Sequence, residues 1–311
     1  MRLVFCGTPQ FAVPALEALL AAEHEVALVL AQPDRPVGRK QLLTAPRVKQ
    51  TAVLRDIPVL QPEKLRNNPE LEAKLSEIAP DAIVVVAYGR IIPPWMLALP
   101  RFGNINVHAS LLPKYRGAAP MQWALANGEK TTGVTTMLLN EELDTGLMID
   151  QRQLQIGEDE TAAELSPRLS ALGAELLIET LAKLADGNAR PVAQVDADAT
   201  LAPILRREDG RIDFARSARE IYNRWRGFQP WPGAFAELRG EKISVLKMRP
   251  AEGARASFVP GSLLAEGKQL FICAGDGGWL ELLELQAAGK RGMAAEEFLR
   301  GHKLQSGERL S

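Results

Sequence analysis

The chain has 311 residues, 46% of them hydrophobic and 24% charged, and its net charge is −1 at pH 7. This length suggests two domains, and the composition of an ordinary globular protein excludes a wholly disordered chain. The N-terminus runs into strand-like sequence without a signal peptide, and no apolar run could span a bilayer, so we expect a cytoplasmic protein. Cys6 and Cys273 lie far apart in apolar runs without metal-ligand spacing. We therefore expect reduced core cysteines and no bound metal.

Short apolar runs rich in β-formers alternate with helix-like stretches in the first half of the chain. The predicted strands are residues 3–6, 26–31, 82–87 and 105–107, and the predicted helices include residues 12–21 and 71–78. Alternation of this kind predicts an α/β fold with a parallel sheet covered by helices on both faces. The chain has neither a Gly-x-Gly-x-x-Gly sequence nor a phosphate-binding loop. The architecture is therefore Rossmann-like, without evidence for a dinucleotide.

The second half of the chain has a different pattern. A long helix-like segment, residues 162–184, closes a first domain of residues 1–188. Residues 189–205 show no periodicity and are interpreted as a linker to a second domain, residues 206–311. This second domain contains an amphipathic stretch followed by five short strand-like runs, which predict a small β-barrel. The five runs are residues 233–238, 242–248, 261–265, 270–274 and 279–285.

Asn106, His108 and Asp144 are the most informative residues. On an extended segment, Asn106 and His108 point to one face, whereas Ile105 and Val107 point the other way, into the core. A carboxamide supplies N–H donors and an imidazole supplies a donor or a proton acceptor, as acyl transfer to an amine through a tetrahedral oxyanion requires. Asp144 lies on a separate loop, and the fold must bring it to His108. There its carboxylate would fix the imidazole tautomer and stabilise the protonated ring.

Taken singly, His108 is also compatible with an ordinary buried histidine, and Asp144 with a turn residue. Their combination is more specific, because the segment 104–117 closely resembles the formyl-donor site of the folate-dependent formyltransferases, and 133–146 resembles their Gly…Asp-x-Gly signature. This resemblance implies that 10-formyltetrahydrofolate is the donor, a co-substrate, and that Asn106 and His108 stabilise the oxyanion while Asp144 holds His108. It also implies an open, OB-like C-terminal barrel. The implied folate-binding residues are Ser110, Leu111, Leu112 and Pro113.

Basic residues are concentrated in two places, although the net charge is near zero. From Arg206 to Arg249 there are eleven basic and six acidic residues, a local excess of 11 − 6 = +5. A basic OB-like barrel is a common nucleic-acid platform, and the alternative interpretation is a solvated arginine-rich face. Residues 32–49 form a second basic segment, whose Pro and Gly content argues against regular structure. Both segments therefore predict contacts with phosphates.

The resemblance extends over the whole chain to those formyltransferases that act on the α-amino group of methionyl-initiator tRNA for translation initiation. In these enzymes the loop matching residues 32–49 enters the acceptor stem. This chain has Gly38-Arg39-Lys40 where Gly-Arg-Gly is usual, which leaves the detailed contacts of the loop open. The residues predicted to bind tRNA are Arg35, Arg39, Lys40, Arg206, Arg207 and Lys247.

Other functions are compatible with parts of the sequence. Sugar-amine formyltransferases of the UDP-aminoarabinose type share the Asn-x-His…Asp pattern, the Ser-Leu-Leu-Pro loop and a Pro-Trp-Pro-Gly-like segment, and they are the main alternative. Glycinamide ribonucleotide formyltransferase is disfavoured by the C-terminal domain, which a small substrate does not need. A folate- or RNA-binding module without catalysis is disfavoured by the intact Asn106, His108 and Asp144. No apolar helix stands out as a dimer interface, so a monomer is the default expectation.

Overall fold

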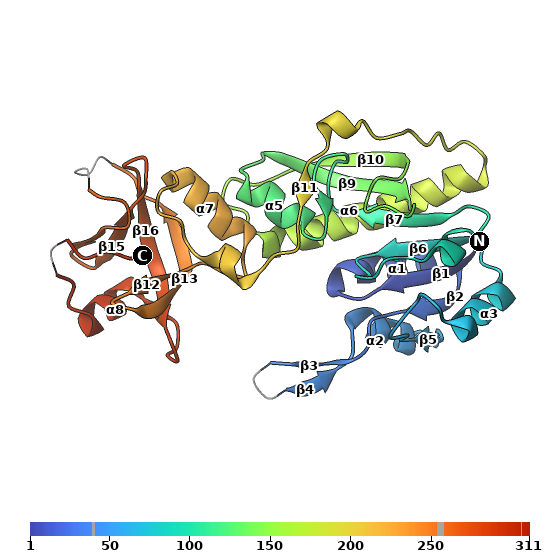
Figure 1. The fold of residues 1–311 in the computed structure, drawn as a ribbon, viewed down its shortest axis with the longest axis horizontal. Coiled ribbons are helices and arrows are strands. Elements are labelled where there is room, and N and C mark those ends of the chain that lie inside the picture. The colour runs from blue at the N-terminus through green and yellow to red at the C-terminus, as the bar shows by residue number, and fades with distance from the viewer. Residues whose placement is uncertain (39–40, 254–257, 306) are drawn as a thin grey trace. The chain divides into compact units, whose positions relative to one another are not determined.

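The computed structural model describes residues 1–38, 41–253, 258–305 and 307–311. The chain forms two compact units (Figure 1). The first unit comprises Met1–Pro120, Thr131–Gln155 and Leu165–Pro203, and the second comprises Met121–Lys130, Ile156–Glu164 and Ile204–Ser311. Within the described part of the chain, no helix is both long and apolar enough to cross a membrane.

The first unit is built on a seven-stranded sheet with the order β10-β9-β7-β6-β1-β2-β5 (Figure 1). The strands from β5 to β7 in this order are parallel, whereas β9 and β10 extend the sheet in antiparallel fashion. The α/β, Rossmann-like fold is confirmed, and the antiparallel edge is an addition to it. The strands are β1 (Arg2–Gly7), β2 (Glu25–Leu30), β5 (Val59–Leu60), β6 (Ala82–Val86), β7 (Asn104–His108), β9 (Thr131–Leu138) and β10 (Met148–Gln155).

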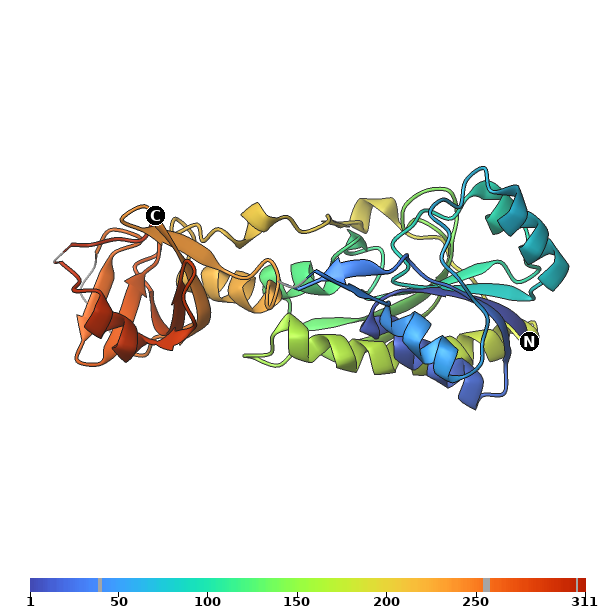
Figure 2. The ribbon, with the colours of Figure 1, turned by 90° about the horizontal axis from the view of Figure 1, so that it is seen from below.

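Helices cover both faces of this sheet, as the views in Figures 1 and 2 show. The helices α1 (Val13–Ala21), α2 (Arg47–Leu54) and α6 (Ala162–Ala185) pack on one face, and α3 (Pro69–Ile78) and α4 (Pro94–Leu97) pack on the other. Strand β1 contributes to both cores, because its successive side chains alternate between the two faces. Leu3 and Phe5 lie in one core, whereas Val4 and Cys6 lie in the other. Such a strand must be apolar throughout, which explains the continuous run in the sequence.

The basic segment 32–49 contains regular structure, so the expectation of irregular chain was wrong there. Strand β3 (Arg35–Val37) pairs in antiparallel fashion with β4 (Leu42–Thr44), and α2 begins at Arg47. Proline is tolerated in an edge strand, where the missing N–H breaks no ladder hydrogen bond, and Pro36 lies in such a two-stranded ribbon. Gly38 has a φ of 72°, a turn conformation that glycine adopts readily.

A second short pairing joins distant segments of the first unit. Strand β8 (Arg116–Gly117) runs parallel to β11 (Leu201–Ala202). The remaining short elements of the chain are α5 (Pro120–Ala126) and the 3-10 helices η1 (Gln10–Ala12), η2 (Asp196–Asp198) and η3 (Arg207–Gly210). The pairing of β11 with β8 ties the segment before β11 to the first unit.

The second unit contains an antiparallel sheet with the order β12-β13-β16-β15-β14, and β17 pairs with β16. Register shifts between β13 and β16 mark bulges, which bend strands and help a sheet to curl. All five predicted barrel strands are present, in agreement with the expected OB-like barrel. The strands are β12 (Phe235–Leu238), β13 (Glu241–Pro250), β14 (Leu263–Glu266), β15 (Gln269–Cys273), β16 (Trp279–Ala287) and β17 (Met293–Ala294).

Two helices complete the second unit, α7 (Ala218–Gly227) and α8 (Ala295–Gly301). Helix α7 begins with a capping box, in which Ser217 and Glu220 each bind the other's main-chain N–H. Near its end, a Cβ at Gly227 would lie 2.5 Å from the Gln122 carbonyl oxygen, so only glycine allows α7 to approach α5 this closely. The second unit thus includes residues from before position 165, and the domain limits 1–188, 189–205 and 206–311 stay a prediction.

Candidate active site

The candidate site lies at the carboxyl end of β7, where open α/β sheets bind their ligands. Asn106 is 9% exposed and His108 is 6% exposed. Ile105 and Val107 belong to the hydrophobic core on the opposite face of the strand, as the alternation along β7 predicted. The strand therefore presents Asn106 and His108 on one side, in a largely dehydrated environment.

A hydrogen bond of the His108 ring fixes its tautomer. Its Nε2 atom lies 2.9 Å from the main-chain carbonyl oxygen of Tyr115, and a carbonyl can only accept, so Nε2 carries a hydrogen. In the neutral ring, Nδ1 then has a free lone pair, and this atom lies 3.7 Å from Oδ2 of Asp144. The fold thus brings Asp144 to His108, as predicted, but the expectation that the Asp144 carboxylate fixes the tautomer was wrong, because the Tyr115 carbonyl does so. A proton arriving at Nδ1 would meet a buried carboxylate.

The Asp144 loop is held by main-chain contacts. The Gly117 N–H donates to Oδ2 of Asp144 at 2.8 Å, and Asp144 itself has a φ of 54°, which is uncommon outside glycine. Two residues later, a Cβ at Gly146 would lie 1.8 Å from the Leu138 carbonyl oxygen. The Asp-x-Gly pattern therefore has two physical reasons: the aspartate supplies the carboxylate, and the glycine lets the loop close against β9.

The loop 110–113 is anchored by two residues that the sequence did not reveal as functional. Thr135 donates from Oγ1 to the Ser110 carbonyl at 2.7 Å and accepts the Leu112 N–H at 3.1 Å. Gln151 donates to the Leu112 carbonyl at 2.7 Å. The sequence carries no signal for Thr135, since threonines recur along β9, and its role follows only from its full burial in the structure, because a buried hydroxyl needs partners. Gln151 gave no signal, since polar residues alternate along β10.

The residues predicted to bind tRNA are placed in part. Arg35 lies exposed on β3, and Arg206, Arg207 and Lys247 lie exposed in the second unit. Burial and the charge of Arg207 lower the pKa of Lys242. Arg39 and Lys40 lie outside the described residues. The tRNA contacts themselves stay a prediction.

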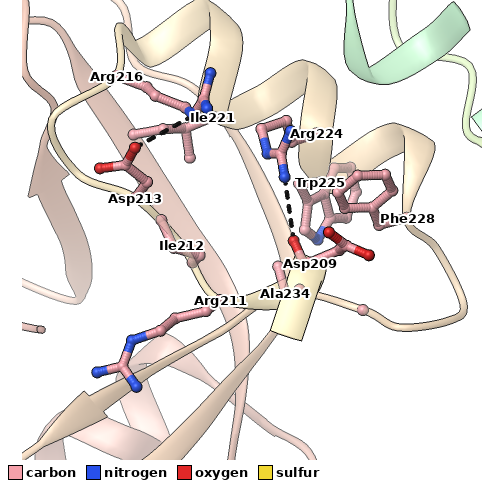
Figure 3. A pocket seen from close by; sticks show the side chains of 12 residues that line it. Asp209, Arg211, Ile212, Asp213, Arg216, Ile221, Arg224, Trp225, Phe228 and Ala234 are labelled. Atoms are coloured by element: carbon pink, nitrogen blue, oxygen red, sulfur yellow. Dashed lines mark hydrogen bonds and ion pairs between the residues drawn. The ribbon is translucent and has the colours of Figure 1, made fainter. Parts of the chain in front are cut away.

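Many of the basic residues between 206 and 249 are engaged within the protein. Arg224 lies over the Phe228 ring at 4.8 Å and donates to the Asp209 carbonyl at 3.4 Å, and Figure 3 shows it beside a small pocket of the second unit. Arg226 is 4% exposed. Side-chain carboxylates pair with Arg211, Arg216, Arg219, Arg239 and Arg249. The local excess of +5 therefore overstates the charge that a partner would meet.

Two family models match the chain: "Formyl transferase" over residues 1–181 and "Formyl transferase, C-terminal domain" over residues 204–303. The chain is 60% identical to the methionyl-tRNA formyltransferase of Acidobacterium capsulatum over 310 residues, covering 100% of this chain and 99% of the relative. It is 55% identical to the enzyme of the same name from Koribacter versatilis, covering 100% and 98%.

A solved structure shows the same fold at low sequence identity. An N-formyltransferase from Helicobacter canadensis, in complex with folinic acid and dTDP-3-aminofucose, matches with a TM-score of 0.67 and 19% identity. This match covers 92% of this chain and 98% of that one. The full-length identity to the enzymes from Acidobacterium capsulatum and Koribacter versatilis is 60% and 55%, against this 19%, and both parts of the chain match formyl transferase models. The chain therefore belongs to the methionyl-tRNA formyltransferase family.

Proposed function

We propose that the protein transfers the formyl group of 10-formyltetrahydrofolate to the α-amino group of methionyl-initiator tRNA, giving N-formylmethionyl-tRNA for translation initiation. The observation that carries the proposal is the buried pair of His108 and Asp144 beside Asn106, at the carboxyl edge of the sheet in a chain of this family. The proposed location is the cytoplasm and the proposed state is a monomer.

Formyl transfer requires the amine to lose a proton and the folate nitrogen to gain one. We assign His108 Nδ1 as the acceptor of the amine proton, since Nε2 already donates to Tyr115. As the amine attacks the formyl carbon, the carbonyl oxygen becomes an oxyanion, which the N–H donors of Asn106 stabilise. The protonated His108 can then also donate a hydrogen bond from Nδ1 to the oxyanion. The Asp144 carboxylate, 3.7 Å from Nδ1, balances the positive charge of the ring. The proton finally moves to the leaving nitrogen of the folate.

The loop of Ser110, Leu111, Leu112 and Pro113 is the proposed folate-binding element. Ser110 is fully buried and donates from Oγ to the Lys114 carbonyl at 2.6 Å, while Thr135 fixes the other side of the loop. A loop held in this way can present its main-chain groups to a flat ring without reorganising. The proposed reaction needs the folate donor and these protein groups, and no step assigns a role to a metal.

Methionyl-tRNA is the proposed acceptor because the relatives that are 60% and 55% identical over the full chain carry that substrate in their name. Restriction to the initiator tRNA is our own part of the proposal. A sugar amine is the alternative, supported by the common fold of the Helicobacter canadensis enzyme. Phosphate binding by Arg35, Arg206, Arg207 and Lys247 would make tRNA affinity fall with salt, whereas a nucleotide sugar offers far fewer phosphates.

The test is formyl transfer from 10-formyltetrahydrofolate to methionyl-initiator tRNA, run beside methionyl-elongator tRNA and a UDP-amino sugar at two salt concentrations. Rapid, salt-sensitive formylation of the initiator alone is the expected result. Product from the sugar alone would overturn the acceptor and leave the assignment of Asn106, His108 and Asp144 intact. Absence of product with every acceptor would overturn the proposed activity.

A further inference from the structure

A segment remote in sequence from His108 and Asp144 supports both of these residues. We call residues 192–202 the strap. Its main chain pairs with Met148 at Val192 and with β8 at Leu201–Ala202, so both of its ends are anchored on the first unit. Between these ends, the side chains of Gln194 and Thr200 reach the loops that carry the catalytic groups. Its composition is that of a linker, yet it makes hydrogen bonds to the residues around His108 and Asp144.

Gln194 is bonded to both sides of the Asp144 loop. Its Nε2 atom donates to the main-chain carbonyls of Asp144 at 2.8 Å and of Gly146 at 2.9 Å. Its Oε1 atom accepts from Nε of Arg116 at 2.9 Å, and Arg116 is only 9% exposed. The amide therefore uses both of its N–H groups and its oxygen within one network.

The same network also reaches the Asp144 carboxylate. The residue after Arg116 is Gly117, whose N–H donates to Oδ2 of Asp144. Gln194 thus holds the Asp144 main chain directly. Through Arg116 it also holds Gly117, whose N–H donates to the Asp144 side chain. Asp144 has an uncommon left-handed φ of 54°, and a residue in such a conformation needs its surroundings to hold it.

Thr200 supports the histidine in the same manner. Its Oγ1 atom accepts the Tyr115 N–H at 2.9 Å, and its main-chain carbonyl accepts the Arg116 N–H at 2.9 Å. Tyr115 also has a left-handed φ, 62°, and its carbonyl is the acceptor for Nε2 of His108. The strap therefore holds the Tyr115 carbonyl, which sets the His108 tautomer, and the Gly117 N–H, which orients the Asp144 carboxylate.

From these contacts we propose that Gln194 and Thr200 are positioning residues for the His108–Asp144 pair. The inference rests on the proposed function for its kinetic readout. Neither side chain touches the reacting atoms, so the loss of either one should act by letting His108 or Asp144 leave its productive position. A misplacement of about 1 Å lowers turnover by as much as about 100-fold.

The kinetic test compares Gln194→Ala with Gln153→Ala, in which an exposed glutamine of β10 is removed instead. We expect Gln194→Ala to lower kcat by about 10- to 100-fold with little change in the KM of the folate donor. A kcat within about 2-fold of the Gln153→Ala value would overturn the role of Gln194.

A double variant separates positioning through Asp144 from general loss of structure. If Gln194 acts through Asp144, the double variant Gln194→Ala, Asp144→Asn should have a kcat within about 3-fold of that of Asp144→Asn alone, because the two changes affect one unit. If the kcat loss of the double variant equals the product of the two single losses, Gln194 does not act through Asp144. Thr200→Ser keeps the hydroxyl and should retain activity, whereas Thr200→Val should not.

An NMR measurement tests the strap without turnover. The ¹⁵N shifts of His108 should report hydrogen at Nε2 in the unmodified protein and a mixture of tautomers in Thr200→Val, while Thr200→Ser keeps the original pattern. Unchanged shifts in Thr200→Val would overturn the role of Thr200. If the unmodified protein forms no product with any acceptor, the proposed function fails, but the tautomer result still decides whether the strap sets His108.

Discussion

Arg226 donates from one guanidinium nitrogen to the main-chain carbonyls of Gly157, at 3.2 Å, and Glu160, at 3.0 Å. Its other terminal nitrogen donates to Asn223 at 2.8 Å, within the same helix. Arg226 is almost fully buried, so its guanidinium relies on these acceptors in place of water. The side chain thus joins α7 to a segment more than sixty residues earlier in the chain.

Replacing Arg226 by methionine should therefore destabilise the second unit. The methionine keeps much of the apolar stem but removes the hydrogen bonds made by a buried charged group, which costs about 1–3 kcal/mol of unfolding free energy. Chemical denaturation followed by tryptophan fluorescence measures this loss. Arg219→Met is the control, since Arg219 is half exposed and lies 3.7 Å from an exposed Glu158, a pair worth about 0–1 kcal/mol. Equal losses in the two variants would contradict the buried role.

Asn106→Asp should give a folded but nearly inactive protein. The substitution replaces N–H donors by a negative charge that faces the developing oxyanion, and loss of one such donor alone lowers kcat by about 10²- to 10³-fold. The measurement is single-turnover formyl transfer, with circular dichroism and Tm as controls for folding. A variant with more than about a tenth of the original rate would refute this role, because the loss would be under about 1.4 kcal/mol.

Removing the exposed basic side chains of the second unit should weaken tRNA binding. The triple variant Arg206→Ala, Arg207→Ala, Lys247→Ala should raise the KM for tRNA and leave the KM for the folate donor unchanged. The slope of log affinity against log salt should fall by about one for each phosphate that the variant no longer binds. Lys74→Ala, on α3 of the first unit, removes one exposed lysine as a control. An unchanged salt slope in the triple variant would place the tRNA elsewhere.

Asp81 should make stability dependent on acid pH. The Arg2 N–H, which donates to its carboxylate at 2.7 Å, and the nearby Arg101 hold the pKa of Asp81 below its ordinary value of 3.8. A depressed folded-state pKa stabilises the protein above pH 3.8, and this contribution disappears as the pH falls through the lowered pKa. Asp81→Asn should therefore reduce Tm at pH 7 but not at strongly acid pH. Asp186→Asn, which also removes one exposed carboxylate, is the control for the change in net charge. A Tm deficit of the same size at both pH values in Asp81→Asn would contradict this explanation.

The sequence predicted those features that depend on local periodicity. The five barrel strands, the helix α6 and the shared face of Asn106 and His108 follow from the spacing of apolar residues along one segment. The meeting of His108 and Asp144 was predicted from the resemblance to a family, since no local signal joins the end of a strand to a distant loop.

Contacts between distant main-chain groups could not be predicted. The acceptor for His108 is a carbonyl, that of Tyr115, and every residue has one. Similarly, a count of charges overlooked the ion pair of Arg239 with Glu308, because pairing depends on the tertiary fold. The β3–β4 hairpin was missed because Pro36 was counted as a breaker without regard to its place on an edge.

The parallel pairing of β8 with β11 affects how members of this family can be recombined. The segment after α6 would ordinarily be treated as replaceable, and a chimaera that takes its C-terminal part from a relative would be joined near residue 188. Such a junction would place residues 194 and 200 from one parent against the Asp144 and Tyr115 main chains of another. Chimaeras joined after Ala202 keep the whole strap with its own loops, and these are the ones that we expect to retain native turnover.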